Sequence, residues 1–431
     1  PAEGAERAAE RSRVVRESAH DAHHGAHVAK QDVAAPFALA EATGWFSGPL
    51  AAVRTLAAGP FGRARARVGA LAAPPVATEL QVDEQLSLAD RVATADATLR
   101  AIGLVDGFAP IVLLCGHHSA TENNPYGAAL ACGACGGHGG GPNARAAAAI
   151  LNAADVREHL RRAGIDIPTD TWFVPAAHDT TTDVVEILDE HLVPASHEAA
   201  LAAVREDLRQ AGLGLSSERV ATLPGSRRGG APSRASEEVH TRSSDWAQVY
   251  PEWGLAGNAA IVIGPRSITE GVDLGRRAFL HSYDAALDPT GSILESILTA
   301  PLVVAQWINA QYYFSSVDPE QFGSGTKTIH NAVGGIGVLA GGSGDLRRGL
   351  PWQSVGEGRR LVHEPVRLLA VVQAPTAVID EIVARTPLLQ QLLGNGWIAM
   401  AARGDDHSPW MRRARDGWEP WVLDGEAEVA A

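Results

Sequence analysis

The chain has 431 residues, of which 45% are hydrophobic, and its mean hydropathy is −0.04. A chain of this length and composition can form a large packed core, in two or three domains or in one large domain with insertions. The net charge of −14 argues against nucleic acid as a partner and against direct adsorption to an anionic lipid surface.

The cysteines and the apolar runs indicate the redox compartment of the chain and whether it crosses a membrane. Cys115, Cys132 and Cys135 all fall within 21 residues, a clustering that argues against a disulfide scaffold and is typical of a metal or redox site in a reducing compartment. No signal-peptide pattern is present. The longest apolar run, 298–308, is interrupted by Gln306 and is shorter than the ~20 residues of a spanning helix. We therefore expect that this chain does not itself cross a membrane.

The N-terminal part, residues 1–105, is predicted to be helical. A stretch rich in Ala, Arg and Glu over 1–30 favours a helix, and 37–57 predict a broken helix packed on a core. Residues 84–102 predict an amphipathic helix. The chain starts at Pro1 without a methionine, so we expect this part to be truncated upstream.

The next part, residues 106–213, is predicted to be an α/β segment. An apolar run over 110–114 predicts a buried strand, and residues 116–141 predict a Gly-rich loop. A helix is predicted over 143–163 and a second strand over 171–174. Two more helices are predicted over 182–192 and 197–211.

Residues 214–239 are poor in apolar side chains and predict a mobile linker or loop, followed by a C-terminal α/β part over 240–431. Three further buried strands are predicted in that part, over 259–263, 367–372 and 397–401. Short apolar strands that alternate with helices predict an α/β fold with a largely parallel sheet.

The segment most informative about chemistry spans residues 115–145 and reads CGHHSATENNPYGAALACGACGGHGGGPNAR. It holds three thiols and three imidazoles directly after a predicted strand, and in open α/β sheets sites form beyond the carboxyl ends of strands. Zinc prefers Cys and His ligands, and a catalytic zinc keeps one position open for water. The segment is therefore a candidate zinc site.

Residue spacing alone leaves several interpretations of this segment open. Cys132 and Cys135 form a CxxC pair that can be redox-active, although no thioredoxin-like βαβ pattern precedes it. The segment could also be a Gly-rich structural turn with buried thiols. A third interpretation is a zinc ion held wholly within the segment, for example by Cys115, His117, Cys132 and Cys135.

Two other features each have a functional and a structural interpretation. His178, with Asp179 and Asp183, follows a predicted strand, and either a proton relay near the site or a turn with a capped helix start over 180–183 explains this pattern. The apolar, aromatic stretch 297–314 is either part of the core or a surface for a partner.

Longer motifs match a known family. The Cys/His segment closely resembles the DabA family, in which a motif of the form CGHGS…NNPY…CGACGG precedes GPNAR. The resemblance covers about 37–403, nearly the whole chain. Its further motifs are HDTTTD (178–183), SDWAQVYPEWGLAGNAAIVIGPRS (244–267), DLGRRAFLHSYD (273–284), ILTAPLVVAQWINAQYYFSSVDPEQFGSGTKTIHN (297–331), GLPWQSV (349–355), HEPVRLLAVVQAP (363–375) and LLGNGW (392–397).

The resemblance implies a β-carbonic-anhydrase-like core with large helical additions and one zinc ion, Zn2+. His117 and Cys132 match two of the family's zinc ligands, and we expect Cys115, Cys135 and His178 to support them from beside the metal. The family's other two ligands belong to a CxD motif followed by an Arg, and this sequence contains no CxD. We therefore expect that they were lost by truncation or come from a separate polypeptide.

The function that the resemblance implies is hydration of CO2 to bicarbonate in an inorganic-carbon uptake complex. The partner would be a membrane subunit of the DabB type, related to cation antiporters, which couples hydration to an ion gradient. The protein would then be peripheral, on the cytoplasmic face of the cell inner membrane. Two other functions stay open: a non-catalytic scaffold that binds the membrane partner, and a cytosolic zinc hydrolase.

Overall fold

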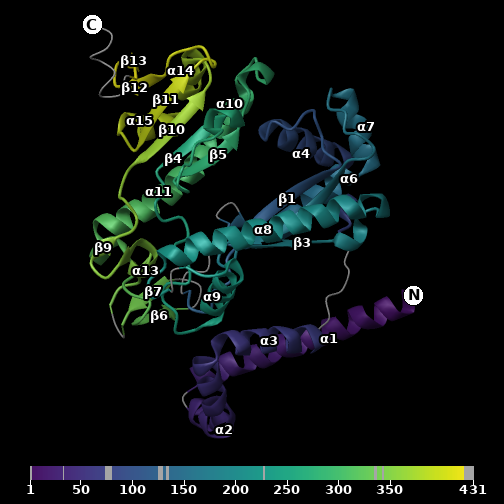
Figure 1. The fold of residues 1–431 in the computed structure, drawn as a ribbon, viewed down its shortest axis with the longest axis vertical. Helices are drawn as coiled ribbons and strands as arrows, with labels where there is room; N and C mark the ends of the chain where they lie inside the picture. The colour runs from purple at the N-terminus through teal and green to yellow at the C-terminus, as the bar shows by residue number, and fades with distance from the viewer. Residues whose placement is uncertain are drawn as a thin grey trace.

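The computed structural model describes residues 2–32, 34–72, 80–124, 130–132, 135–226, 229–333, 337–341 and 344–421 (Figure 1). Its α-helices are α1 (Ala2–Gln31), α2 (Ala35–Leu56), α3 (Ala58–Ala72), α4 (Leu88–Ala101), α6 (Gly141–Asn152), α7 (Ala154–Arg162), α8 (Glu198–Thr222), α9 (Pro232–Ser244), α10 (Ser292–Thr299), α11 (Pro301–Val317), α12 (Pro319–Phe322), α13 (Trp352–Val355), α14 (Thr376–Arg385) and α15 (Pro387–Gly394). Short 3-10 helices are η1 (Val82–Glu84), η3 (Glu190–Leu192), η4 (Ala195–His197), η5 (Arg266–Thr269) and η6 (Ala285–Leu287).

The strands form two main sheets and two small hairpins. They are β1 (Ile111–His118), β2 (Trp172–Asp179), β3 (Val184–Ile187), β4 (Ala260–Gly264), β5 (Ala278–Ser282), β6 (His330–Val333), β7 (Gly337–Ala340), β8 (Gly356–Glu357), β9 (Arg360–Leu361), β10 (Leu368–Gln373), β11 (Ile398–Arg403), β12 (Met411–Ala414) and β13 (Gly417–Pro420). The strands predicted over 110–114, 171–174, 259–263, 367–372 and 397–401 correspond to β1, β2, β4, β10 and β11.

A three-stranded sheet, in the order β1-β2-β3, carries the Cys/His segment. β1 and β2 are parallel, in a register that pairs His117 with His178, and β3 runs antiparallel to β2. Helix α6 packs on this sheet, and its Ala148 and Leu151 share a buried cluster with Phe173 of β2. Apolar contacts between this helix and the sheet therefore fix the strands whose ends carry the candidate site.

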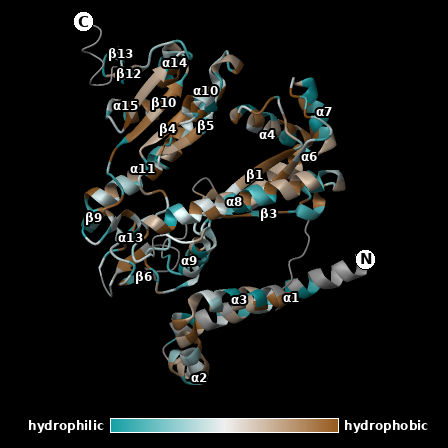
Figure 2. Cartoon of the chain, in the orientation of Figure 1, coloured by the Kyte–Doolittle hydropathy of each residue, from teal (hydrophilic) through white to brown (hydrophobic). Residues whose placement is uncertain are grey.

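A six-stranded sheet, in the order β13-β12-β11-β10-β4-β5, forms the C-terminal part. Its strands β5, β4, β10 and β11 are parallel, whereas β12 and β13 add an antiparallel edge. Figure 2 shows β10 and β1 in hydrophobic colours, as expected for strands that the sequence marks as short apolar runs. The predicted α/β architecture is confirmed, but the sheets mix parallel and antiparallel strands instead of being largely parallel, and the β-carbonic-anhydrase-like core stays a prediction.

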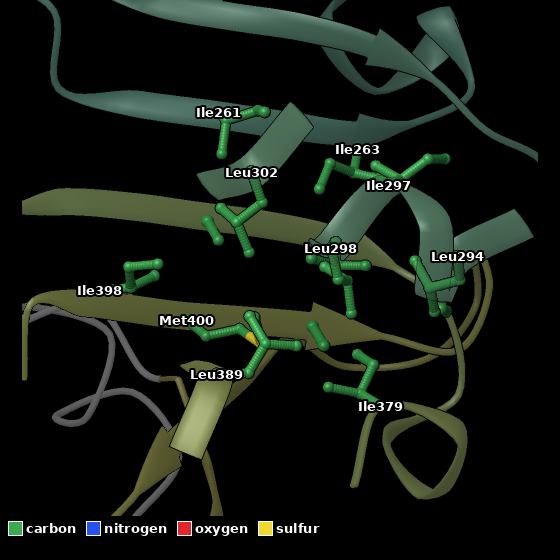
Figure 3. Packing of buried hydrophobic residues seen from close by; sticks show 14 of the residues in the cluster. Ile261, Ile263, Leu294, Ile297, Leu298, Leu302, Ile379, Leu389, Ile398 and Met400 are labelled. Atoms are coloured by element: carbon green, nitrogen blue, oxygen red, sulfur yellow. The ribbon is translucent and has the colours of Figure 1, made fainter. Parts of the chain in front are cut away.

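The largest hydrophobic core lies between this sheet and helices α10 and α11 (Figure 3). Leu294, Ile297, Leu298 and Leu302 have at most 1% of their surface exposed, and they pack towards Ile263 of β4. Burying each such side chain contributes roughly 1.5–3 kcal/mol to folding. The helices thus cover an apolar sheet face that water would otherwise contact.

Among the residues that the structure describes, one stretch, Ser292–Val317, is long and apolar enough to cross a membrane. It is divided between α10 and α11 at Ala300, and it supplies the core residues just described. Within 297–314, Trp307 is the one large apolar side chain that is exposed. Packing on the sheet accounts for the buried apolar side chains of 297–314, so its interpretation as part of the core is confirmed, and its role as a partner surface stays a prediction.

Residues 214–239 are not a linker in the part that the structure describes. Helix α8 continues to Thr222 and α9 begins at Pro232, while residues 227 and 228 lie outside the described residues. The two helices pack on each other, and their Val220 and Val239 are buried. Few apolar residues suffice here because helical spacing places them on one inward face.

Two other secondary-structure predictions are also wrong. Residues 182–192 form strand β3 and a 3-10 turn instead of a helix, because Asp183 adopts the left-handed conformation (φ 59°) and reverses the chain after β2. The β-branched Val184 and Val185 that follow favour a strand. The helix predicted over 143–163 is two helices, α6 and α7, with extended backbone at Ala153 between them.

Helices α1–α3 lie at one end of the molecule (Figure 1). The prediction of a helix over 1–30 is confirmed by α1. Residues 37–57, predicted as a broken helix on a core, instead form the continuous helix α2, which retains Pro49 and has no buried residue. The prediction of core packing is wrong because only the α2–α3 junction, at Ala58 and Gly59, is buried against the body.

Candidate functional site

Three predicted site residues share one face at the carboxyl end of β1. Cys115 and His117 are two positions apart on the strand, so their side chains point to the same face. The parallel register pairs His117 with His178, so the two imidazoles are neighbours on that face. Cys115 and His117 are exposed and His178 is half-buried. The carboxyl ends of parallel strands are where sites form in open α/β sheets.

The loop that carries Cys132 is fastened to the same strand end. The amide of Gly140 donates to the carbonyl of His117 at 2.9 Å, and the amide of Cys132 donates to the carbonyl of His138 at 3.1 Å. A Cβ on Gly116 would lie 2.4 Å from the carbonyl carbon of Gly140, so only glycine fits this backbone contact. The two predicted zinc ligands, His117 and Cys132, therefore belong to one strand-and-loop unit.

Cys135 lies beside Cys132 and is not paired with Cys115. The thiols of Cys132 and Cys135 are in hydrogen-bond contact, and this contact is the main reason that the pKa of Cys135 is raised. The side-chain amide of Asn143, in the first turn of α6, donates to the sulfur of Cys135 at 3.2 Å. This hydrogen bond lowers the pKa of Cys135 and partly offsets the rise. All three cysteines are free thiols.

The protonation of His117, unlike that of Cys115, suits metal ligation. The ring of His117 is partly covered, which lowers its pKa, and the neighbouring His178 and His118 lower the pKa further, so the neutral imidazole is favoured. A neutral imidazole offers a nitrogen lone pair to a metal. Burial raises the pKa of Cys115, although the backbone amide of His178 partly opposes the shift, and this keeps Cys115 a thiol.

Behind His178 lies a buried ion pair. The ring nitrogen Nε2 of His178 is 3.3 Å from Oδ1 of Asp183, and the guanidinium of Arg219 in α8 donates to both oxygens of Asp183 at 3.0 and 2.7 Å. Burial raises the pKa of Asp183, but hydrogen bonds from His178 and Arg219 outweigh it, so the net pKa is lowered. The arrangement holds the His178 ring in place next to His117. The turn predicted over 180–183 is present, but strand β3 follows it in place of a helix.

A second buried carboxylate, Glu252, ties the strand ends to the C-terminal part. Its Oε1 accepts hydrogen bonds from the hydroxyl of Ser119 at 2.5 Å and from the hydroxyl of Thr181 at 3.0 Å. Its Oε2 lies 3.8 Å from Nη1 of Arg219. Burial lowers the pKa of Lys327 to about 8, and the charge of Glu252 opposes that shift. Charged side chains from distant segments therefore meet behind the candidate site.

Arg219 and Glu252 were not predicted as site residues from the sequence. Arg219 lies in the stretch that had the composition of a linker, and Glu252 lies in a long motif without any Cys or His. Arg219 is 36 residues from Asp183 along the chain, and Glu252 is 133 residues from Ser119. No local pattern signals such pairs.

The described residues supply part of the donor set that a zinc ion needs. Zinc sites use four ligands, or three and a water molecule, drawn from Cys, His and carboxylates. The described residues bring together no group of three or more His, Cys, Asp and Glu that could hold a metal. They do place one neutral imidazole, His117, and one thiol, Cys132, on the same strand-and-loop unit. This is the chemistry of two zinc ligands, and it fits a site that other residues complete.

The fold and the site describe an α/β protein with an imidazole and a thiol at the carboxyl end of a parallel strand. The profile of a family described as "Probable inorganic carbon transporter subunit DabA" matches residues 2–398. The chain belongs to the DabA family.

Several curated relatives carry the same description. A DabA 1 from Bradyrhizobium sp. strain BTAi1 is 53% identical over 325 residues, which is 75% of this chain and 38% of the relative. The protein from Chloroflexus aurantiacus is 51% identical over 320 residues, 74% of this chain and 38% of the relative. The protein from Rhodopseudomonas palustris strain TIE-1 is 50% identical over 341 residues, which is 79% of this chain and 41% of the relative. This chain therefore spans about two fifths of these relatives. No solved structure matches it.

Proposed function

We propose that this chain supplies half of the zinc site of an inorganic carbon transporter subunit that hydrates CO2 to bicarbonate. The observation that carries the proposal is the attachment of the Cys132 loop to the carbonyl of His117, which ties an imidazole and a thiol to one strand end. The printed names of the relatives supply the substrate class, because each is called an inorganic carbon transporter subunit. A β-carbonic-anhydrase-like core in the complete protein is part of this proposal.

In this proposal each residue has a defined task. His117 would donate a ring nitrogen to zinc and Cys132 a thiolate sulfur. When bound, zinc would lower the pKa of a water molecule and so supply a nucleophile at neutral pH. His178 packs beside His117, and Asp183 fixes the orientation of its ring. The remaining two ligands and any charge on the opposite side of the site would come from residues outside this sequence.

Zinc analysis of the complete protein tests the ligand assignment. We expect one zinc per chain, and His117→Ala or Cys132→Ala should reduce zinc content at least tenfold, because an open site that loses a ligand no longer holds its metal. Cys115→Ala is the matched control and should retain zinc. This chain alone should bind zinc weakly. Tight binding of one zinc by this chain would instead identify a purely local Cys-rich site. The same conclusion would follow if Cys115→Ala and Cys135→Ala lost as much zinc as His117→Ala.

A non-catalytic scaffold is the second candidate, because the described residues supply no third ligand. CO2 hydration by the complete protein in the presence of its partner separates the two functions. Hydration that disappears in His117→Ala supports the enzyme. A complex that assembles normally, holds no zinc and does not hydrate CO2 supports the scaffold.

We further propose that the partner is a membrane subunit of the DabB type at the cytoplasmic face of the inner membrane, and that it contacts α2. The exposed fractions of Trp45, Phe46 and Leu56 are 86%, 79% and 87%. A helix with this much apolar surface requires a cover, and exposed patches of this kind mark interaction sites. The word "subunit" in the family description supports a protein partner.

The charges on α2 favour a protein surface over lipid as this cover. Helices that lie on anionic membranes carry Lys and Arg on the polar face. Glu41 and Arg54 are the charged residues of α2, and Arg54 is already paired with Glu122. No free cation is left on this helix to attract anionic lipid, and an apolar protein surface satisfies the exposed side chains directly.

Fractionation of cells tests this contact. With the membrane subunit present, the complete protein should sediment with membranes and remain there in high salt, because an apolar contact is not screened. The double variant Trp45→Ser and Phe46→Ser should shift it to the supernatant. Trp307→Ser, at an exposed position elsewhere, is the control and should sediment normally. Sedimentation without the membrane subunit would point to direct lipid contact and would overturn the proposal.

A further inference from the structure

The thiols of Cys132 and Cys135 have the geometry of a dithiol that can close. The amide of Cys135 donates to the carbonyl of Cys132 at 3.1 Å, which is the hydrogen bond of a tight turn between residues three apart. Such turns hold the two Cα atoms less than about 7 Å apart, within the range that disulfides span.

The surroundings keep this dithiol accessible and polar. Both thiols are partly exposed, and the amide of Gly137 donates to the carbonyl of Cys132 at 3.0 Å, which stabilises the turn. The side chain of Asn143 donates to the sulfur of Cys135 at 3.2 Å and holds this side chain beside the turn. Cys115 makes its own contact with the carbonyl of Gly116 at 3.4 Å and is held on β1.

We propose that Cys132 and Cys135 form a reversible disulfide when a hydroperoxide oxidises the protein, and that this disulfide withdraws Cys132 from the zinc site. The first half of the proposal stands on the dithiol geometry, and the second half rests on the proposed function.

The reaction balances with hydrogen peroxide as the oxidant. The thiolate of one cysteine attacks a peroxide oxygen, the O–O bond breaks and a sulfenic acid forms as hydroxide leaves. The second thiol attacks the sulfenic sulfur, the S–S bond forms and water leaves. In total, two thiols and one hydrogen peroxide give one disulfide and two water molecules. A small-molecule dithiol reverses the step by exchange.

The consequence for the metal follows from ligand chemistry. Zinc binds the thiolate form of cysteine, and a disulfide sulfur carries no such charge. Closing the pair therefore removes one of the two predicted ligands while His117 stays in place. Conversely, bound zinc would occupy the Cys132 thiolate and slow its oxidation. The site would hold metal in a reducing cell and release it under oxidative stress.

The first test uses this chain without added metal. Treatment with hydrogen peroxide should give a Cys132–Cys135 disulfide, detected as a two-dalton loss in the peptide that contains both residues, and dithiothreitol should restore the thiols. Cys115→Ala should behave like the unaltered chain, whereas Cys135→Ser should give no intramolecular disulfide. Circular dichroism checks that the Ser variant is folded. Pairing of either cysteine with Cys115, or oxidation to sulfinic acid without a disulfide, overturns the proposal.

The second test uses the complete, zinc-loaded protein. Peroxide should release zinc at least tenfold faster from the unaltered protein than from Cys135→Ser, because the Ser variant cannot close the pair. If the disulfide forms in the first test but the complete protein never holds zinc, the proposed zinc site fails and the dithiol stands. If zinc is held and released equally by both proteins, the link between the dithiol and the metal is wrong.

Discussion

In the six-stranded sheet, the cluster between the strands and helices α10 and α11 consists of apolar side chains, such as Ile263 and Leu298. In the three-stranded sheet, buried charges lie behind the strand ends, where Asp183, Arg219 and Glu252 meet. Both sheets contain short, parallel apolar strands, such as β1 and β10. The difference shows that apolar packing stabilises the six-stranded sheet. In the three-stranded sheet, charged side chains replace apolar ones near the strand ends and hold polar side chains in fixed positions.

The largest effect on stability is expected at Arg219. Arg219→Ala would leave the buried carboxylates of Asp183 and Glu252 without their cation, which costs about 3–5 kcal/mol. Arg209→Ala, in the same helix, breaks an exposed pair with Glu206 and should cost much less, because water already screens that pair. Urea unfolding curves of the two variants measure the difference. Equal effects would mean that the buried charges do not stabilise the three-stranded sheet.

The core of the six-stranded sheet should respond to a loss of volume. Leu298 is fully buried, and Leu298→Ala removes apolar contacts and leaves a cavity, for a cost of about 2–5 kcal/mol. Leu287→Ala, at a half-exposed position, is the control and should change stability by less than about 0.5 kcal/mol. Thermal unfolding followed by circular dichroism would measure the difference in stability between the two variants. The reactivity of Cys132 and Cys135 in folded Leu298→Ala should stay unchanged, since they belong to the other sheet.

The two regions should also differ in their response to pH. Burial lowers the pKa of His363 to about 4, against ~6.5 in an unfolded chain. Between these values the unfolded state binds the extra proton, so the stability from neutral His363 is complete above about pH 6.5 and is lost as pH falls towards 4. The stability that comes from ionised Asp183 is lost only below about pH 4, because the pKa of this carboxyl is lowered in the folded protein.

Stability measured from pH 7 to 4 tests this assignment. His363→Asn keeps an acceptor for the amide of Gly257, which now donates to Nδ1 at 2.9 Å, and removes the titrating ring. The unaltered protein loses free energy of unfolding between about pH 6.5 and 4. We expect this loss to be smaller in His363→Asn by on the order of 2 kcal/mol. An unchanged slope would assign the dependence to other histidines.

The smallest stability effect is expected at the candidate ligand. His117 is exposed on β1, so His117→Ala should change the free energy of unfolding by less than about 0.5 kcal/mol. The same substitution should abolish zinc binding by the complete protein. A urea curve and a zinc measurement on one preparation separate the two effects. A large loss of stability without metal would mean that His117 is a structural residue like those of the six-stranded sheet.

The sequence by itself determined the features that depend on near neighbours in the chain. The apolar runs at 110–114, 259–263 and 367–372 predicted strands that the structure contains, because burial on both faces requires consecutive apolar side chains. The Cys/His segment 115–145 identified the candidate ligands, and its long motifs identified the family. Each of these signals is carried by residues that are contiguous or nearly so.

Tertiary structure decided what depends on residues far apart in the chain. The ion pair of Arg219 with Asp183 and the hydrogen bond of Ser119 to Glu252 join segments whose local patterns carry no charge-pairing signal. The same limit applies to apolar stretches. Residues 297–314 and helix α2 are both apolar, but the first lies on a sheet and the second remains exposed. Hydropathy measures the free energy available from burial, and only the packing of the whole chain determines which surface is buried.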